Sequence, residues 1–128
     1  MIQPQKPERT TGIKHVFAAA SYSLGGIKCL WKEAAFRQEV LLYLLVIAGF
    51  ALIGATPAEY LIATTLALLL VAVEALNTAI EAVVDHVSPD WSEFARDAKD
   101  LGSLAVMCLL IANGLFLAYV LWQHLILA

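Results

Sequence analysis

The sequence has 128 residues, of which 61% are hydrophobic and 15% are charged, and its mean hydropathy is +0.78. Ordinary soluble domains are less apolar, so the composition indicates an integral membrane protein. The formal net charge is −3, and without a basic patch the chain has nothing that favours a nucleic acid partner. Cys29 and Cys108 lie far apart in the sequence and match no metal or redox spacing, so we expect ordinary apolar-site cysteines.

The amino-terminal part divides into a polar tail and an amphipathic segment. Residues 1–11 contain Pro4 and Pro7 and lack the apolar region of a signal peptide, which predicts a flexible tail. Residues 12–32 repeat apolar side chains at helical spacing, with the lysines mostly on other faces. This pattern predicts a helix lying on the membrane surface. A helix that packs on soluble partners is the alternative.

Three long apolar segments follow, and the sequence predicts one membrane span in each. We expect these spans at residues 36–56, 58–84 and 99–126, because about 20 apolar residues cross a bilayer as a helix. Gly54, Thr56 and Pro57 indicate a short turn after the first span, and residues 85–98 are expected to form a polar loop. The length of 128 residues fits one all-α membrane domain, 1–128. Three helices make a thin core, which favours a homo-oligomer.

The basic residues indicate the orientation of these spans. Six of the eight Lys and Arg residues precede or begin the first span, while Arg96 and Lys99 stand between the apolar parts of the second and third. The positive-inside rule then puts the amino-terminus and the 85–98 loop in the cytoplasm. Trp122 and His124 are expected to anchor the third span at the opposite interface.

The second predicted span carries a stripe of polar residues. At about 100° per residue, Asn77 and Glu81 lie within about 60° of Glu74, and Asp85 lies about 20° from it. A carboxylate at the bilayer centre costs about 2.5–3.5 kcal/mol on insertion scales. A helix end that dips into water would explain Asp85 and Glu81, but Glu74 lies about 16 Å of helix from Asp85. We therefore expect Glu74 to be functional.

The stripe and the charges near it have the parts that phosphoryl transfer needs. Glu74 and Glu81 lie about 10.5 Å apart along the helix, roughly the reach of a triphosphate and its metal. Glu81 and Glu33 could hold a hydrated cation together with phosphates, and Lys99 could pair with a phosphate beside Asp100. Glu74 could accept a proton from a lipid hydroxyl. On spacing alone, a proton-coupled transporter or channel subunit fits about as well.

Several motifs resemble the bacterial diacylglycerol kinase family of small integral-membrane lipid kinases. The strongest are EAAFRQE at 33–39, VEALNTAIEAVVD at 73–85 and AKDLGSLAV at 98–106, and TTG at 10–12 and AASYS at 19–23 are also similar. The resemblance covers about residues 10–125. By this resemblance, Glu74 is the catalytic base, and Glu33 and Glu81 bind the metal. The nucleotide-binding residues implied are Tyr22, Glu33, Asn77, Glu81, Lys99 and Asp100. The substrate-binding residues implied are Ser23, Ala35, Phe36, Arg37, Gln38, Glu39, Glu74 and Ser103.

The resemblance also implies an activity and an assembly. The expected reaction moves the γ-phosphoryl group of ATP, with Mg²⁺ as cofactor, to diacylglycerol and gives phosphatidic acid. The expected form is a homotrimer in the bacterial inner membrane, with each active site between neighbouring subunits. An undecaprenol kinase is the sibling alternative, although EAAFRQE and AKDLGS favour the diacylglycerol branch. A proton-coupled transporter would leave Glu33, Lys99 and Asp100 without a role.

Overall fold

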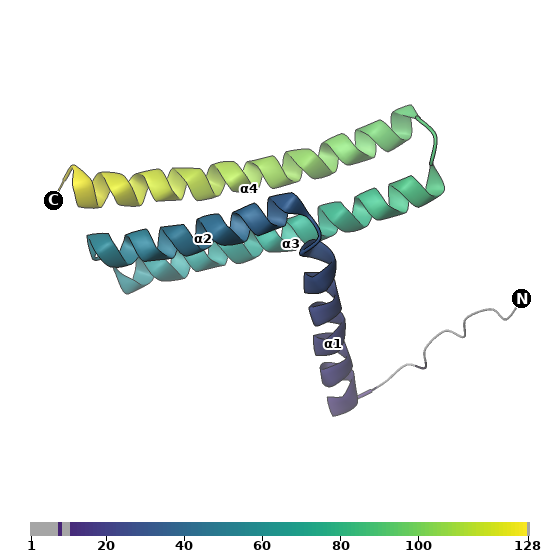
Figure 1. Cartoon of the computed structure of the whole chain (residues 1–128), viewed down its shortest axis with the longest axis horizontal. Coiled ribbons are helices and arrows are strands. Elements are labelled where there is room, and N and C mark those ends of the chain that lie inside the picture. Colours follow the sequence, from purple (N-terminus) through teal and green to yellow (C-terminus); the bar gives the residue numbers. More distant parts are fainter. Residues whose placement is uncertain (1–7, 9–10, 128) are drawn as a thin grey trace, which may run out of the picture. The chain divides into compact units, whose positions relative to one another are not determined.

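A computed structural model gives the structure of residue 8 and of residues 11–127. These residues form four helices and no strand: α1 (Ile13–Leu30), α2 (Ala34–Ile53), α3 (Pro57–Val87) and α4 (Glu93–Leu125) (Figure 1). The all-α prediction is confirmed for this part of the chain. The predicted tail, 1–11, lies outside the described residues except for residues 8 and 11.

The chain separates into two compact units, Met1–Lys32 and Glu33–Ala128. The first unit contains α1, which begins after Gly12 at a φ of 69°, a backbone angle that glycine adopts readily. The helix continues without a break through Gly25 and Gly26, and it leaves Ile13 and Phe17 largely exposed. The membrane-surface position of this helix stays a prediction.

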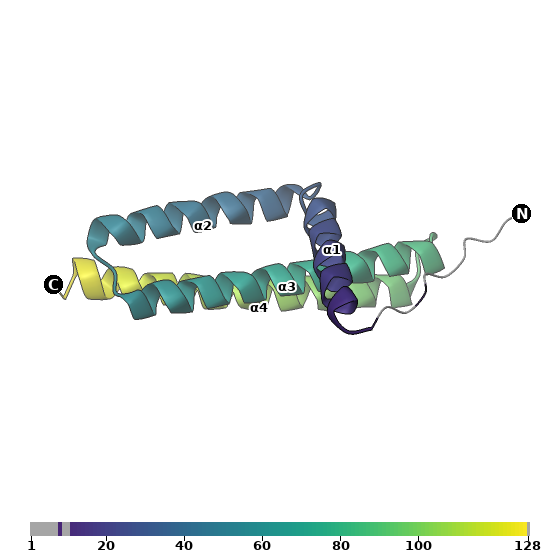
Figure 2. The same cartoon turned by 90° about the horizontal axis from the view of Figure 1, so that it is seen from below.

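The second unit consists of three helices that are long and apolar enough to cross a membrane. The α3 helix packs mainly on α4 and less extensively on α2. Figures 1 and 2 show α3 and α4 running antiparallel, with α2 beside the first half of α3. The second half of α3 therefore extends past α2 and is accompanied by α4.

The connection between α3 and α4 is shorter than the predicted loop at 85–98. The α3 helix continues to Val87, and α4 already begins at Glu93. The early start has a local cause, because the Ser92 hydroxyl accepts a hydrogen bond from the Ala95 amide at 3.1 Å and caps the helix. The Ser88 and Ser92 hydroxyls are also bonded at 2.8 Å across the connection. The polar composition of this region therefore belongs mostly to helix ends.

The buried core of the three-helix unit lies at the end where α2 connects to α3. Phe50, Ala63 and Val120 form one buried cluster, and the Phe50 ring meets Tyr60 edge-on at 5.6 Å between centroids. The turn after α2 is made by Gly54, which has a φ of 72°. The next helix begins with a capping box between Thr56 and Glu59.

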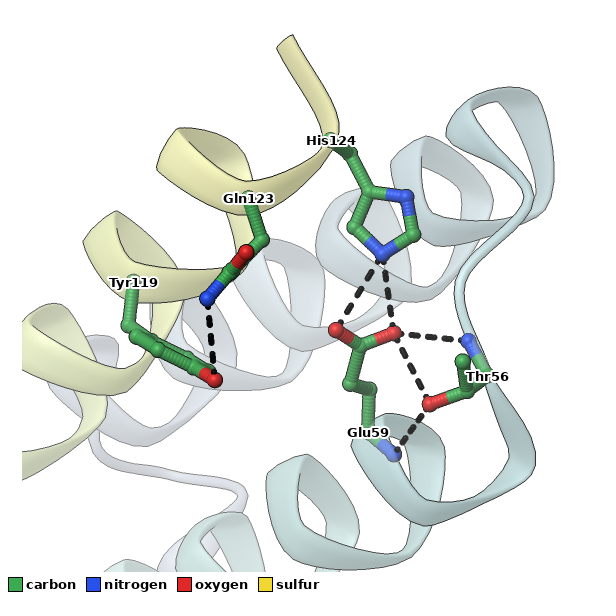
Figure 3. A network of polar contacts seen from close by, with 5 residues as sticks. All are labelled: Thr56, Glu59, Tyr119, Gln123 and His124. Atoms are coloured by element: carbon green, nitrogen blue, oxygen red, sulfur yellow. Dashed lines mark hydrogen bonds and ion pairs between the residues drawn. The ribbon is translucent and has the colours of Figure 1, made fainter. Parts of the chain in front are cut away.

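A polar network joins α3 to α4 at this same end (Figure 3). His124 Nε2 lies 3.0 and 3.1 Å from the two carboxylate oxygens of Glu59. Glu59 also accepts hydrogen bonds from the amide and hydroxyl of Thr56 at 2.7 and 3.0 Å. The side chains of His124 and Glu59 are only 21% and 13% exposed. His124 is therefore an interhelical partner, a role that the sequence alone did not suggest.

We expect His124→Ala to lower the thermal midpoint of the protein in mild detergent. In the variant, the partly buried Glu59 carboxylate keeps its hydrogen bonds from Thr56 but loses the one from His124. A buried acceptor that loses a partner destabilises the folded protein. Gln123→Ala is the matched control, because among the described residues Gln123 bonds to the exposed Tyr119 of its own helix, at 3.2 Å, and to no other helix. Equal midpoints for the two variants would show that the His124 contact does not stabilise the bundle.

Candidate functional site

The polar stripe of the sequence lies on the second half of α3. Asn77 Nδ2 donates a hydrogen bond to Glu81 Oε1 at 3.0 Å, one helical turn away. Glu74, Asn77 and Glu81 are all half-buried in the single chain. The Asn77 Oδ1 atom is buried and has no hydrogen-bond partner among the described residues. Asn77 and Glu81 are thus joined to each other, and this part of the stripe is shielded from full solvation.

Glu39 on α2 meets Glu74 on α3. Their carboxyl groups are close enough to interact, and one oxygen of Glu39 is buried without a partner in the described residues. Two acids that approach from different helices form a polar position inside an otherwise apolar bundle. The structure therefore brings the predicted base next to one of the predicted substrate-binding residues.

Glu39 also lines two apolar cavities, of about 160 and 150 Å³. The larger cavity lies between α2, α3 and α4, and its wall includes Val46, Phe50 and Leu117. The smaller cavity lies between α2 and α3, where the Tyr43 hydroxyl is bonded to that of Thr64 at 2.8 Å. The carboxyl pair thus stands beside space that suits hydrocarbon.

A charged hollow lies at the α3–α4 connection. The Lys99 ammonium donates a hydrogen bond to the Asp85 carboxylate and is also attracted by Glu81. Lys99 and Asp100 line an open hollow of about 320 Å³, together with Asp85 and Arg96. Cationic side chains of this kind pair with phosphates.

The contact between Asp85 and Lys99 is the feature of this region that the sequence does not predict. Asp85 stands on the stripe near the end of α3, and its 65% exposed side chain agrees with a helix end in water. The signal was the opposite charge of Lys99, 14 positions later. That pair becomes apparent only when the connection is known to span just residues 88–92, because a short connection brings the two helix ends together.

The oxygen donors of this region suit a hard cation. Carboxylates are the ligands that Mg²⁺ prefers, and one or two of them with substrate phosphates suffice. Glu81 is held by Asn77, whereas Glu33 is the N-cap residue of α2. In residues 8 and 11–127 no group of three or more His, Cys, Asp or Glu side chains is arranged to hold a metal.

The remaining predicted residues lie on three helices. Tyr22 and Ser23 are exposed on α1, where the Ser23 hydroxyl donates to the Ala19 carbonyl at 3.0 Å. Ser103 is exposed on α4, one position after the buried Gly102. The first two turns of α2 carry Ala35, Phe36, Arg37 and Gln38.

Comparison with known proteins gives a consistent result. The profile described as prokaryotic diacylglycerol kinase matches residues 21–121. A diacylglycerol kinase of Sinorhizobium sp is 54% identical over 113 residues, which cover 88% of this chain and 82% of that protein. The diacylglycerol kinase of Escherichia coli K12 is 41% identical over 118 residues, 90% of this chain and 95% of that protein. That of Helicobacter pylori is 33% identical over 123 residues, 95% of this chain and 92% of that protein.

The profile match spans most of the chain, and the relatives align with it over nearly their whole lengths. The family expected from the motifs around Glu33, Glu74 and Lys99 is thereby confirmed. This chain belongs to the prokaryotic diacylglycerol kinase family.

Proposed function

We propose that this protein is a membrane kinase that transfers the γ-phosphoryl group of ATP to the hydroxyl of diacylglycerol and forms phosphatidic acid. The similar proteins of Sinorhizobium and Escherichia coli are named diacylglycerol kinase. The observation that carries the proposal is the meeting of Glu39 and Glu74 beside an apolar cavity. A polar acceptor within hydrocarbon-lined space suits a lipid alcohol better than a soluble one.

The reaction divides the stripe into two parts. Glu74 accepts the proton of the lipid hydroxyl while the hydroxyl oxygen forms a bond to the γ-phosphorus of ATP. The bond between that phosphorus and the oxygen that leaves with ADP breaks. The apolar cavity beside Glu39 receives part of an acyl chain. Farther along α3, Glu81 and Glu33 would hold Mg²⁺, which neutralises phosphate charge when bound. Lys99 exchanges its bond to Asp85 for a phosphate, and Asn77 and Asp100 line the nucleotide.

The half-buried stripe supports a homotrimer with shared sites. Acids within a membrane helix face protein or water rather than lipid, yet Glu74 and Glu81 are only half-covered in one chain. Large apolar side chains beside the stripe, such as Leu76 at 63% exposure, are also available for packing. We propose that a neighbouring subunit covers this face, with the amino-terminus and the 88–92 connection in the cytoplasm of a bacterial inner membrane.

The proposed activity is tested by offering the purified protein radiolabelled ATP with diacylglycerol or with undecaprenol. We expect labelled phosphatidic acid as the main product, and this labelling should require Mg²⁺. Preferential labelling of undecaprenol would assign the protein to the sibling activity instead. No transfer to either lipid, together with proton movement in sealed vesicles, would favour a transporter.

Mixing two inactive variants tests the shared site. We expect Glu74→Gln and Lys99→Ala proteins to regain part of the native rate after co-assembly. Recovery requires that Glu74 and Lys99 of one site come from different subunits; within one chain Lys99 is held by Asp85, which lies about 16 Å of helix from Glu74. Each variant reassembled alone is the control. A monomeric mass in mild detergent would contradict the trimer, and no recovery would place both residues in one subunit.

A further inference from the structure

The α4 helix approaches the stripe closely at Gly102. A Cβ atom on this buried glycine would lie 2.1 Å from Asn77 Oδ1 and 3.2 Å from Asn77 Cγ. Real Cβ contacts do not fall below 3.0 Å, so the Asn77 amide occupies the space that any side chain at position 102 would need. In contrast, a Cβ on Gly49 of α2 would meet nothing within 4 Å.

The orientation of the Asn77 amide follows from its other neighbour. Its nitrogen donates to Glu81 Oε1 at 3.0 Å, and an ionised carboxylate can only accept. The amide oxygen must therefore point away from Glu81, and it faces Gly102. That oxygen is buried and has no hydrogen-bond partner among the described residues. Asn77 is thus held between Gly102 and Glu81.

Glu81 lies near a cation as well as near Asn77. The Lys99 ammonium is close enough to attract the Glu81 carboxylate, although its hydrogen bond goes to Asp85. If the Asn77 amide were displaced, Glu81 would lose a neutral donor and would turn more readily to the ammonium. A carboxylate that pairs with an ammonium is a poorer ligand for a cation.

We propose that Gly102 is a positioning residue for the divalent cation. Its missing side chain admits the Asn77 amide, and the amide keeps the Glu81 carboxylate turned toward the cation and away from Lys99. The inference rests on the proposed function, in which Glu81 is a Mg²⁺ ligand. Gly102 itself touches neither the cation nor the substrates.

The test is the binding of Mn²⁺ to the purified protein in detergent at saturating ATP, followed by electron paramagnetic resonance. The ATP affinity of each variant is measured separately, because Asn77 is also proposed to line the nucleotide. We expect Gly102→Ala to weaken Mn²⁺ binding about 10- to 100-fold, the range typical of lost outer-shell contacts. The clash is with the end of a side chain, so Asn77 moves and the helices stay together. Gly49→Ala, which adds the same methyl group in open space, should bind Mn²⁺ as the native protein does.

A double-variant cycle separates positioning from a general packing defect. Asn77→Ala should weaken Mn²⁺ binding by a similar factor, and adding Gly102→Ala to it should have little further effect, because the displaced amide is already absent. If Gly102→Ala alone fails to fold, the Asn77→Ala protein still tests the link to Glu81. Native Mn²⁺ affinity in Asn77→Ala, or full additivity in the double variant, would overturn the proposal.

The Glu81→Ala protein keeps this test distinct from that of the proposed function. Native Mn²⁺ binding in Glu81→Ala would refute the metal assignment itself, whatever Gly102 does. Loss of binding in Glu81→Ala with native binding in Gly102→Ala would refute only the positioning role. A lowered thermal midpoint in Gly102→Ala without a change in Mn²⁺ affinity would likewise reduce Gly102 to a packing residue.

Discussion

Glu74→Gln is expected to lower the turnover of diacylglycerol by about 10²- to 10⁴-fold, the usual contribution of a positioned general base. The amide has nearly the same shape as the carboxyl group, so the packing between α2 and α3 should be kept. It cannot accept the proton of the lipid hydroxyl. The binding of ATP should change little, because Glu74 lies about 10.5 Å along the helix from Glu81. Initial rates and equilibrium nucleotide binding measure the two effects separately.

Glu39→Gln is the matched control for this prediction. Glu39 meets Glu74 from the other helix, so the substitution disturbs the same position and leaves the proposed base in place. We expect a smaller loss of rate and a weaker apparent affinity for the lipid. An inactive Glu39→Gln with an active Glu74→Gln would move the base to Glu39. A near-native rate in both variants would exclude a carboxyl base at this position.

The parts of the fold that depend on local pattern could be predicted from the sequence. Long charge-free segments must be helical in a bilayer, because a helix satisfies its backbone hydrogen bonds internally. The three helices of suitable length and composition agree with this expectation. The shared face of Asn77 and Glu81 follows from the 100° helical rotation, and their hydrogen bond agrees with it.

The length of the α3–α4 connection could not be predicted, because polar residues there belong to helix ends as well as to a loop. Ser92 with the acidic Glu93 directly after it fits a helix start, but the many charges nearby favour a longer loop. Once the connection shortens to residues 88–92, α4 gains a full turn and more, and Lys99 comes beside Asp85.

Contacts between helices also lay beyond the sequence. The pair of Glu59 and His124 joins positions 65 residues apart, and the approach of Gly102 to Asn77 depends on how α4 is shifted along α3. Helical periodicity shows on which face of its own helix a residue lies. It does not show which residue of the neighbouring helix lies at the same level along the axis. For that reason the motif AKDLGSLAV at 98–106 includes Gly102, but the sequence alone gives no physical role to this glycine.

Glu81→Ala is expected to weaken the response to Mg²⁺ strongly. Outer-shell partners of a metal typically contribute 10- to 100-fold in affinity, so loss of a direct carboxylate ligand should raise the Mg²⁺ requirement by at least about 10²-fold. The apparent affinity for diacylglycerol should change much less, because the apolar cavities and Glu39 are untouched. The rate measured across a Mg²⁺ titration at fixed ATP and lipid checks this.

Glu33→Ala provides the companion measurement. If Glu33 is the second carboxylate ligand, raising Mg²⁺ should restore part of its activity, as it should for Glu81→Ala. If Glu33 only pairs with a helix neighbour such as Arg37, a contact of about 0.2–0.5 kcal/mol in an isolated helix, extra Mg²⁺ should have no effect. Glu93→Ala, which removes an exposed acid at the start of α4, is the control for net charge. Native Mg²⁺ titrations in both Glu33→Ala and Glu81→Ala would refute the metal role of the pair.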